Sequence, residues 1–193
     1  KGLTLNLKNR SQSPVELKVE PDIDKPIQKI KEFVDTYNKY LELHKALTKA
    51  VKVDKPGESE KLQESGLFMG DMTIIRLENS LKTAIGASYP SRNENPIKMF
   101  SQMGVSTGKV NSSWESIKEG KLQIDEELLR KAIIENPEGV KEFFGSDTDG
   151  DNKIDNGMAF TLIRTLSPYI SAGKNIIQTK IDFEDQSIKS KDE

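Results

Sequence analysis

The sequence predicts an α+β fold that is mostly α-helical, in which long amphipathic helices form a leg-type bundle with a small β-hairpin and N-terminal strands complete a β-rich domain. Two observations carry this prediction. Apolar residues recur every three or four positions near both ends of the chain, which is typical of helices with one buried face. In the first twenty residues they alternate with polar residues, as in strands.

The alternating segments lie at residues 3–8 and 14–20, and the intervening "NRSQSP" supplies turn-forming residues. Together they predict a β-hairpin. Because a lone two-stranded ribbon is barely stable in water, residues 1–22 are expected to be the last strands of a larger β-rich domain. The chain itself starts without Met, so we expect it to be a piece of a longer protein.

Residues 23–193 are predicted to form a helical domain. Asp24 and Pro26 suit the start of a helix that we expect over residues 26–50. Its apolar seam has spacings of three and four and consists of Ile27, Ile30, Val34, Tyr37, Leu41 and His44. The charged stretch 52–65, with its Pro and Gly, is typical of a connector.

Capping residues predict where the next helices begin. Asp71 precedes an apolar stripe that ends near Gly86, and Asp125 precedes "EELLRKAII". Asn136 and Pro137 end that helix and start a short one. Between them, two short alternating segments predict a hairpin over about 103–124, whose long tip carries Trp114.

Two more amphipathic helices are expected at the C-terminal end. The first is "MAFTLIRTLSPYI", residues 158–170. The second carries a heptad of Ile177, Ile181, Glu184 and Ile188. We expect this last seam to pair with the helix at 26–50, or with helices outside this chain.

The amino-acid composition argues against several classes of function. No run of eighteen apolar residues occurs and the mean hydropathy is -0.61, so no membrane span is predicted. A net charge of -2 with basic and acidic residues intermixed gives no basic stripe for nucleic acid. The chain has no Cys, which excludes disulfides and thiolate chemistry within it.

An enzyme is not predicted, because the inventory of reactive side chains is thin. His44 is the one histidine and lies on a helix seam, where a structural role is favoured over a catalytic one. Residues 104–109, "GVSTGK", resemble a phosphate loop superficially, but the spacing is one residue short and Val110 stands where Ser or Thr should bind magnesium. A strand that ends in a turn explains them better.

The stretch "SDTDGDNKIDNG", residues 146–157, is the one candidate metal site. With Asp147 at position 1, a calcium loop of the EF-hand type would have carboxylates from Asp147, Asp149, Asp151 and Asp155 at positions 1, 3, 5 and 9. Position 6 is Asn152 in place of Gly, and position 12 is Met158 in place of the bidentate Glu. A sensor-class EF-hand is therefore not predicted. A solvated helix-capping turn is favoured, and a weak structural calcium site is the alternative.

Several phrases taken together resemble one family. They are "FVDTYN" at 33–38, "LFMGD" at 67–71, "GKLQIDEELL" at 120–129 and "NGMAFTLIRTLSPYI" at 156–170, in this order. In this combination they are similar to the C-terminal half of FliD, the flagellar filament cap family, also called flagellar hook-associated protein 2. The resemblance covers almost the whole chain. The connector at 52–65, the long hairpin tip and the aspartate loop depart from the family's pattern.

The resemblance implies a structural protein of the bacterial flagellum, secreted to the extracellular tip of the filament, or periplasmic where flagella are internal. It would cap the filament and promote insertion and folding of flagellin. Its expected partners are flagellin, further copies of itself and the adjacent hook-filament junction proteins, with no cofactor, nucleic acid or membrane. Two alternatives stay open: a calcium-dependent binding or adhesion module that uses the aspartate loop, and another axial flagellar protein.

Overall fold

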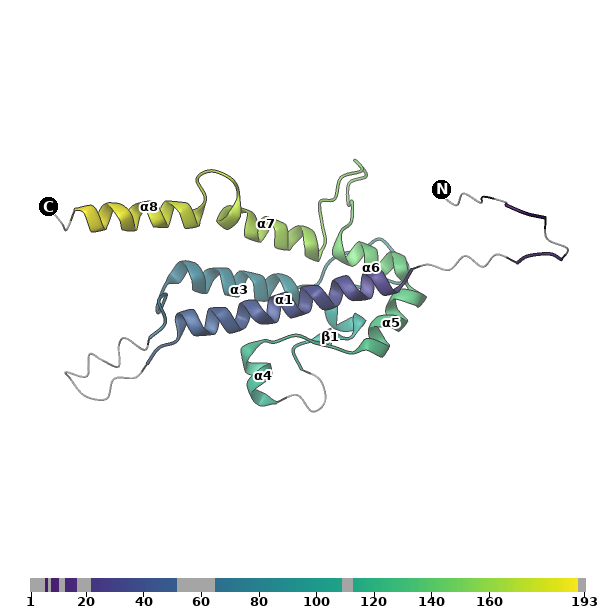
Figure 1. Ribbon diagram of the computed structural model, residues 1–193, viewed down its shortest axis with the longest axis horizontal. Helices are drawn as coiled ribbons and strands as arrows, with labels where there is room; N and C mark the ends of the chain where they lie inside the picture. The colour runs from purple at the N-terminus through teal and green to yellow at the C-terminus, as the bar shows by residue number, and fades with distance from the viewer. Residues whose placement is uncertain are drawn as a thin grey trace.

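The computed structural model describes residues 6, 8–10, 13–16, 22–51, 65–108 and 113–190. In Figure 1 the described part of the chain is elongated, with two long helices side by side and smaller elements at one end. Its elements are, in chain order, α1 (Asp24–Thr48), α3 (Met72–Gly86), the 3-10 helix η1 (Phe100–Met103), β1 (Val105–Ser106), α4 (Trp114–Glu119), β2 (Gln123–Ile124), α5 (Glu126–Glu135), α6 (Pro137–Phe144), α7 (Met158–Ile170) and α8 (Ile176–Lys189). The prediction of a mostly helical α+β chain is confirmed for these residues.

Helix α1 is the spine of the bundle, and its predicted seam is confirmed. The side chains buried along it are Ile27, Ile30, Val34, Tyr37, Leu41 and His44. Three elements from distant parts of the sequence contact α1, namely α3, β2 and α5. Because each of them covers part of one apolar stripe, the stripe determines how these elements are arranged around the helix.

The predicted hairpin is present, and a polar contact fixes it to α1. Strands β1 and β2 are antiparallel, with Val105 opposite Ile124. The Asn38 side chain accepts from the N–H of Leu122 at 2.8 Å and donates to its carbonyl oxygen at 2.9 Å. Leu122 is buried, so both backbone groups would otherwise lack a partner. The tip between the strands forms α4. Gly104 ends η1 with a left-handed backbone, φ 76°, immediately before β1.

Aromatic rings fill the end of the bundle near the start of α1. Phe100 lies 5.5 Å from Phe143, 5.9 Å from Phe144 and 6.1 Å from Phe33, measured between ring centroids. Tyr89 meets Phe143 edge-on at 5.7 Å. These rings join α1, η1 and α6 into one core, since offset and edge-to-face pairs pack without voids.

The predicted helix starts are confirmed by side-chain caps. Asp71 accepts from the N–H groups of Thr73 and Ile74, and Asp125 accepts from that of Leu128. The Asn136 side chain accepts from the N–H of Gly139, so one residue ends α5 and caps α6. Each cap satisfies backbone donors that the first helical turn leaves unpaired.

Helix α8 forms as predicted, but it does not pair with α1. It follows α7, which packs on α3, and it reaches past the end of that pair (Figure 1). On its predicted seam, Ile177, Ile181 and Ile188 are 42%, 48% and 59% exposed. The expectation of pairing between the two end helices is therefore wrong, because the loop 171–175 directs α8 away from α1. Pairing with a helix outside this chain stays a prediction.

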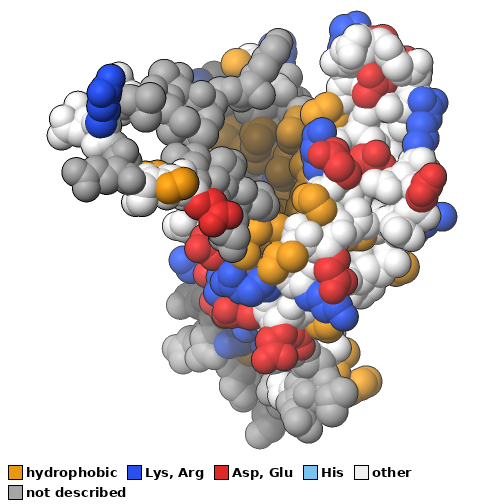
Figure 2. Space-filling view, turned by 90° about the vertical axis from the view of Figure 1, so that its right-hand side faces the viewer, with side chains coloured by type: hydrophobic (Ala, Val, Ile, Leu, Met, Phe, Trp, Pro, Cys, Tyr) orange, Lys and Arg blue, Asp and Glu red, His pale blue; other side chains and the backbone are white. Residues whose placement is uncertain are grey.

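The structure describes only 6, 8–10, 13–16 and 22 of residues 1–22, and only residue 65 of the connector at 52–65, so most of the predicted strands and of the connector lies outside the described residues. The domain boundary between residues 22 and 23 thus stays a prediction. On the face of the molecule drawn in Figure 2, acidic and basic side chains are interspersed, and no stripe of one sign is seen there.

Replacing Val34 by Asp is expected to destabilise the domain by about 3–5 kcal/mol, because an unpaired carboxylate would enter the core. Val34 is only 3% exposed on the buried side of α1. Urea denaturation followed by circular dichroism measures the change. Lys39→Asp puts the same residue on the exposed side of this helix as a control. Equal stabilities of the two variants would contradict the placement of Val34.

A second prediction concerns Asp71, which links α8 to α3. Lys180 of α8 donates to its carboxylate, and this bond, followed by those from Thr73 and Ile74, holds the pKa of Asp71 below its usual value. The stabilisation is therefore fully present above about pH 4, the pKa of an unfolded Asp, and is lost as the pH falls through the lowered folded pKa. Asp71→Asn should be less stable at pH 7 and should lose less stability between pH 4 and pH 2, measured by urea denaturation. Asp35→Asn, exposed on α1, is the control; an unaltered pH profile in Asp71→Asn would count against the link.

Candidate functional site

The aspartate loop between α6 and α7 is held shut by backbone pairing. Ser146 and Asn156 form an antiparallel bridge, in which the N–H of Ser146 donates to the carbonyl oxygen of Asn156 at 3.0 Å. Gly157 follows with φ 110°, and a Cβ there would lie 2.7 Å from the carbonyl group of Phe144. Only glycine fits this closure, because the backbone is left-handed and the space is occupied.

Two contacts fix the loop to residues 90–92, which precede η1. The Asn156 side chain donates to the carbonyl oxygen of Pro90 at 3.0 Å, and Arg92 donates to the carbonyl oxygen of Thr148. Sequence reasoning missed both anchors, since no local pattern relates residues 66 or 56 positions apart. They border an open cleft of about 730 Å³ between the loop and α6.

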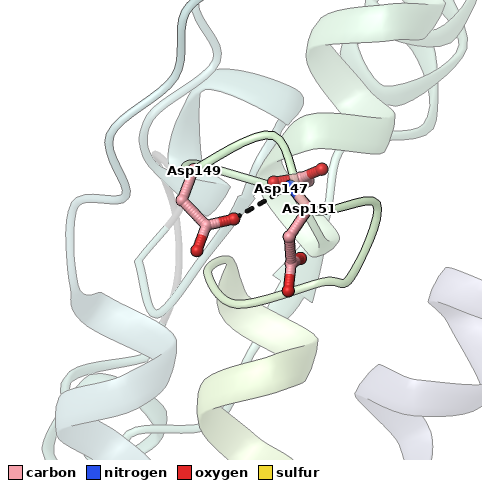
Figure 3. Close-up of side chains that lie close together, drawn as sticks. All are labelled: Asp147, Asp149 and Asp151. Atoms are coloured by element: carbon pink, nitrogen blue, oxygen red, sulfur yellow. Dashed lines mark hydrogen bonds between the residues drawn. The ribbon is translucent and has the colours of Figure 1, made fainter.

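Three of the four predicted carboxylates come together. Asp147, Asp149 and Asp151 each offer an oxygen, and these atoms lie within 4.8 Å of one another (Figure 3). Backbone donors already engage them. The N–H of Gly150 and that of Asn152 bond the two oxygens of Asp147 at 2.6 and 2.7 Å. The N–H of Asp151 bonds Asp149 at 3.0 Å, which is the dashed line in Figure 3.

These backbone donors stabilise the charged form of Asp147. Its pKa lies below the usual value, first because the Gly150 N–H bonds the carboxylate and then because the Asn152 N–H does so. Charge in the cluster is further offset by Lys153, whose ammonium group lies 2.9 Å from Asp151. The loop thus favours the charged form of Asp147 through its own hydrogen bonds.

The structure shows what the two residues that depart from the EF-hand pattern do, at positions 6 and 12 of the loop. Asn152, at the position where an EF-hand loop has Gly, adopts the left-handed backbone that this glycine would supply, with φ 65°; Asn tolerates that conformation. Met158, at the twelfth position, is 1% exposed and belongs to the core, so it offers no replacement for the missing Glu. The loop therefore has the turn of a calcium loop without its last ligand.

Asp155 is not part of the cluster. Its two carboxylate oxygens accept from the Thr148 N–H at 2.9 Å and from the Thr148 hydroxyl at 2.7 Å. It closes the loop from inside, a role that its place in the sequence pattern does not show. Whether the remaining three carboxylates bind calcium stays a prediction.

His44 lies where a structural histidine was expected. It is buried between α1 and α3, with its Nε2 atom 3.5 Å from a carboxylate oxygen of Glu78. Tyr40 lies beside it, and burial raises the pKa of that phenol to about 12, with the Glu78 charge adding to the effect. Within the described part of the chain no nucleophile with an adjacent base accompanies this histidine, so the geometry offers no catalytic centre there.

Comparison with known proteins identifies the family. The family model described as flagellar hook-associated protein 2 C-terminus matches residues 1–193, the full length of the chain. The chain belongs to this family. Its similarity to flagellar hook-associated protein 2 of Treponema pallidum is 32% identity, covering 98% of this chain and 27% of that protein. The corresponding protein of Thermotoga maritima is 30% identical over 80% of this chain and 25% of its own length. That of Salmonella typhimurium is 27% identical over 98% of this chain and 36% of its own length.

The chain therefore spans only about a quarter of the first two of these hook-associated proteins, whose C-terminal parts it matches. This family is one of structural proteins of the flagellum and not of enzymes, in agreement with the empty catalytic inventory. No solved structure matches the chain significantly. None of the helices in the described residues combines the length and apolarity that a membrane crossing would need.

Calcium titration separates the two interpretations of the aspartate loop. A calcium site predicts measurable heat in isothermal calorimetry with Kd on the order of 0.1–1 mM, the range of weak extracellular sites. Asp149→Asn should abolish that heat, because Asp149 belongs to the three-carboxylate cluster, and Asp35→Asn should leave it unchanged. No heat at millimolar calcium would remove the metal site and leave the solvated turn.

Proposed function

We propose that this chain is the leg region of a flagellar filament cap protein, which promotes insertion and folding of flagellin at the growing tip of the filament. The single observation that carries the proposal is the family match over residues 1–193. Flagellin, further copies of the protein and the adjacent hook-filament junction proteins are its proposed partners, and the filament tip is its proposed location.

The architecture suits a mechanical role. Helix α1 has 25 residues, and all its internal backbone hydrogen bonds are made within the element, which makes it stiff along its axis. Helix α3 lies along α1, and α7 packs on α3 (Figure 1). A support of this kind standing between a cap and the filament end would leave gaps in which an incoming chain folds before the cap moves on.

The exposed stripe on α8 supports a leg that is completed elsewhere. Ile177, Ile181 and Ile188 form an apolar row that the described part of the chain leaves about half exposed. Since the relatives are three to four times as long as this chain, we propose that a helix from the remainder of the same protein covers this row. Residues 1–22 would belong to the β-rich domain above the leg.

A calcium-dependent binding or adhesion module is the second candidate function. The observation that favours it is the convergence of Asp147, Asp149 and Asp151. It would require ligand binding that is lost with a chelator. A filament cap requires no metal, and a calcium ion in this loop would act as a clip that positions the start of α7.

Deleting the gene is expected to abolish filament growth and to release flagellin as monomer, because nothing would retain the subunits at the tip. Electron microscopy and an immunoblot for flagellin measure the two effects. Full-length protein supplied in trans should restore filaments, as should its Lys39→Asp variant, whereas Val34→Asp should fail to do so. Filaments of normal length in the deletion strain would overturn the proposed function.

A further inference from the structure

An open cleft of about 850 Å³ separates α4 from the C-terminal half of α1 and the middle of α3. It is distinct from the aspartate loop, which lies near the other end of α1 (Figure 1). The residues that line it are Leu41, His44, Lys45, Thr48, Lys49, Glu78, Lys82, Ser113, Trp114, Lys118 and Glu119.

The cleft carries an excess of positive charge. Four lysines and two glutamates line it, and the glutamates are already engaged, Glu78 by Lys82 at 2.8 Å and Glu119 by Lys45. Lys49 and Lys118 are exposed and form no ion pair with the residues that the structure describes. Two cations are thus left for an anionic partner.

An exposed aromatic ring stands beside these cations. Trp114, at the start of α4, is 78% exposed. A large ring held in water at the edge of a charged cleft is the kind of residue that contributes most to protein interfaces. The partner that fits is therefore a protein segment with both acidic and aromatic side chains.

Such a segment occurs on α8 of the same chain. Asp182 and Asp185 are three residues apart and therefore share one side of this helix, and Phe183 follows Asp182. Phe183 is 68% exposed, and both aspartates are exposed. Lys180, two residues before Asp182, is already paired with Asp71 at the start of α3.

The two surfaces cannot meet within one molecule. In Figure 1, α8 lies on one side of the α1–α3 pair and α4 lies on the other, toward the same end of the molecule. A donor surface and an acceptor surface on opposite sides let copies stand side by side, each presenting α8 to the cleft of the next. Contacts of this head-to-tail type close into rings when the rotation between copies permits it.

We propose that Asp182, Phe183 and Asp185 of α8 bind the cleft between α1, α3 and α4 of a neighbouring copy of this protein, with Phe183 against Trp114. The proposal deepens the proposed function, since it names the contact between adjacent legs of the cap. The occupant is a second copy, because charge and aromatic character match on both surfaces of one sequence.

Cross-linking full-length protein tests the contact. A variant with Lys118→Cys and Asp185→Cys, treated with a short bismaleimide, should give a ladder of multimers on a denaturing gel, since each copy links to two neighbours. A linker is used because an ion pair holds the backbones farther apart than a disulfide allows. Each single variant should stop at dimers. Lys25→Cys with Asp185→Cys is the matched control, because Lys25 is as exposed but lies at the other end of α1. A ladder no stronger than this control would overturn the proposal.

Charge reversal tests the electrostatic part on the same cross-linkable protein. Lys49→Glu alone and Asp182→Lys alone should each lower the yield of multimers about tenfold, because like charges then face each other. The two changes together should restore the yield, with circular dichroism unchanged throughout. Undiminished yields in both single reversals, or no recovery in the combination, would overturn it. Cross-linking is measured on purified protein, so it is independent of filament growth in cells. If the ladder is missing but deletion of the gene still stops filament growth, only the proposed contact is wrong. If the ladder forms but the deletion strain grows normal filaments, only the proposed cap function is wrong.

Discussion

One apolar stripe on α1 organises the described structure. A 25-residue helix with a buried side must be covered along that side, and it cannot provide this cover itself. Cover comes instead from α3, β2 and α5, which are far apart in the chain. Asn38 sets the position of the hairpin on this stripe, since its amide satisfies both backbone groups of the buried Leu122. The aromatic core around Phe100 and Phe143 then closes the end of the bundle.

Helix α8 also has an apolar stripe, but this stripe is not fully covered in the described part of the chain. Its apolar row is as regular as that of α1, yet its members are largely exposed in the described part of the chain. In the described part of the chain α8 is held by the Lys180 to Asp71 contact and by α7, which suits a piece that is completed by other parts of a longer protein. The family match and the greater length of the relatives give this feature a context, because the chain corresponds to one region of a larger structural protein.

The acidic residues of the aspartate loop accept hydrogen bonds from the loop itself. Asp147 and Asp149 accept backbone N–H groups, and Asp155 binds Thr148, so these three carboxylates have hydrogen-bond partners within the turn itself. The bridge between Ser146 and Asn156 closes the loop, and Gly157 connects it to the start of α7. A metal ion would add to a geometry that these hydrogen bonds already supply, which is why the acidic pattern alone does not decide between a turn and a site.

The helices and their starts follow from the sequence by itself, because periodicity and capping are local. Ile27 to His44 mark the seam of α1, and Asp71, Asp125 and Asn136 mark where helices begin. The convergence of three aspartates also follows, since they lie within five residues of one another. Which faces meet was decided only by the tertiary structure. Nothing local tells that Arg92 holds the loop at Thr148, that Asp155 turns inward, or that the seam of α8 stays away from α1. Periodicity states that a face needs a partner, whereas the identity of the partner depends on the path of the chain through space.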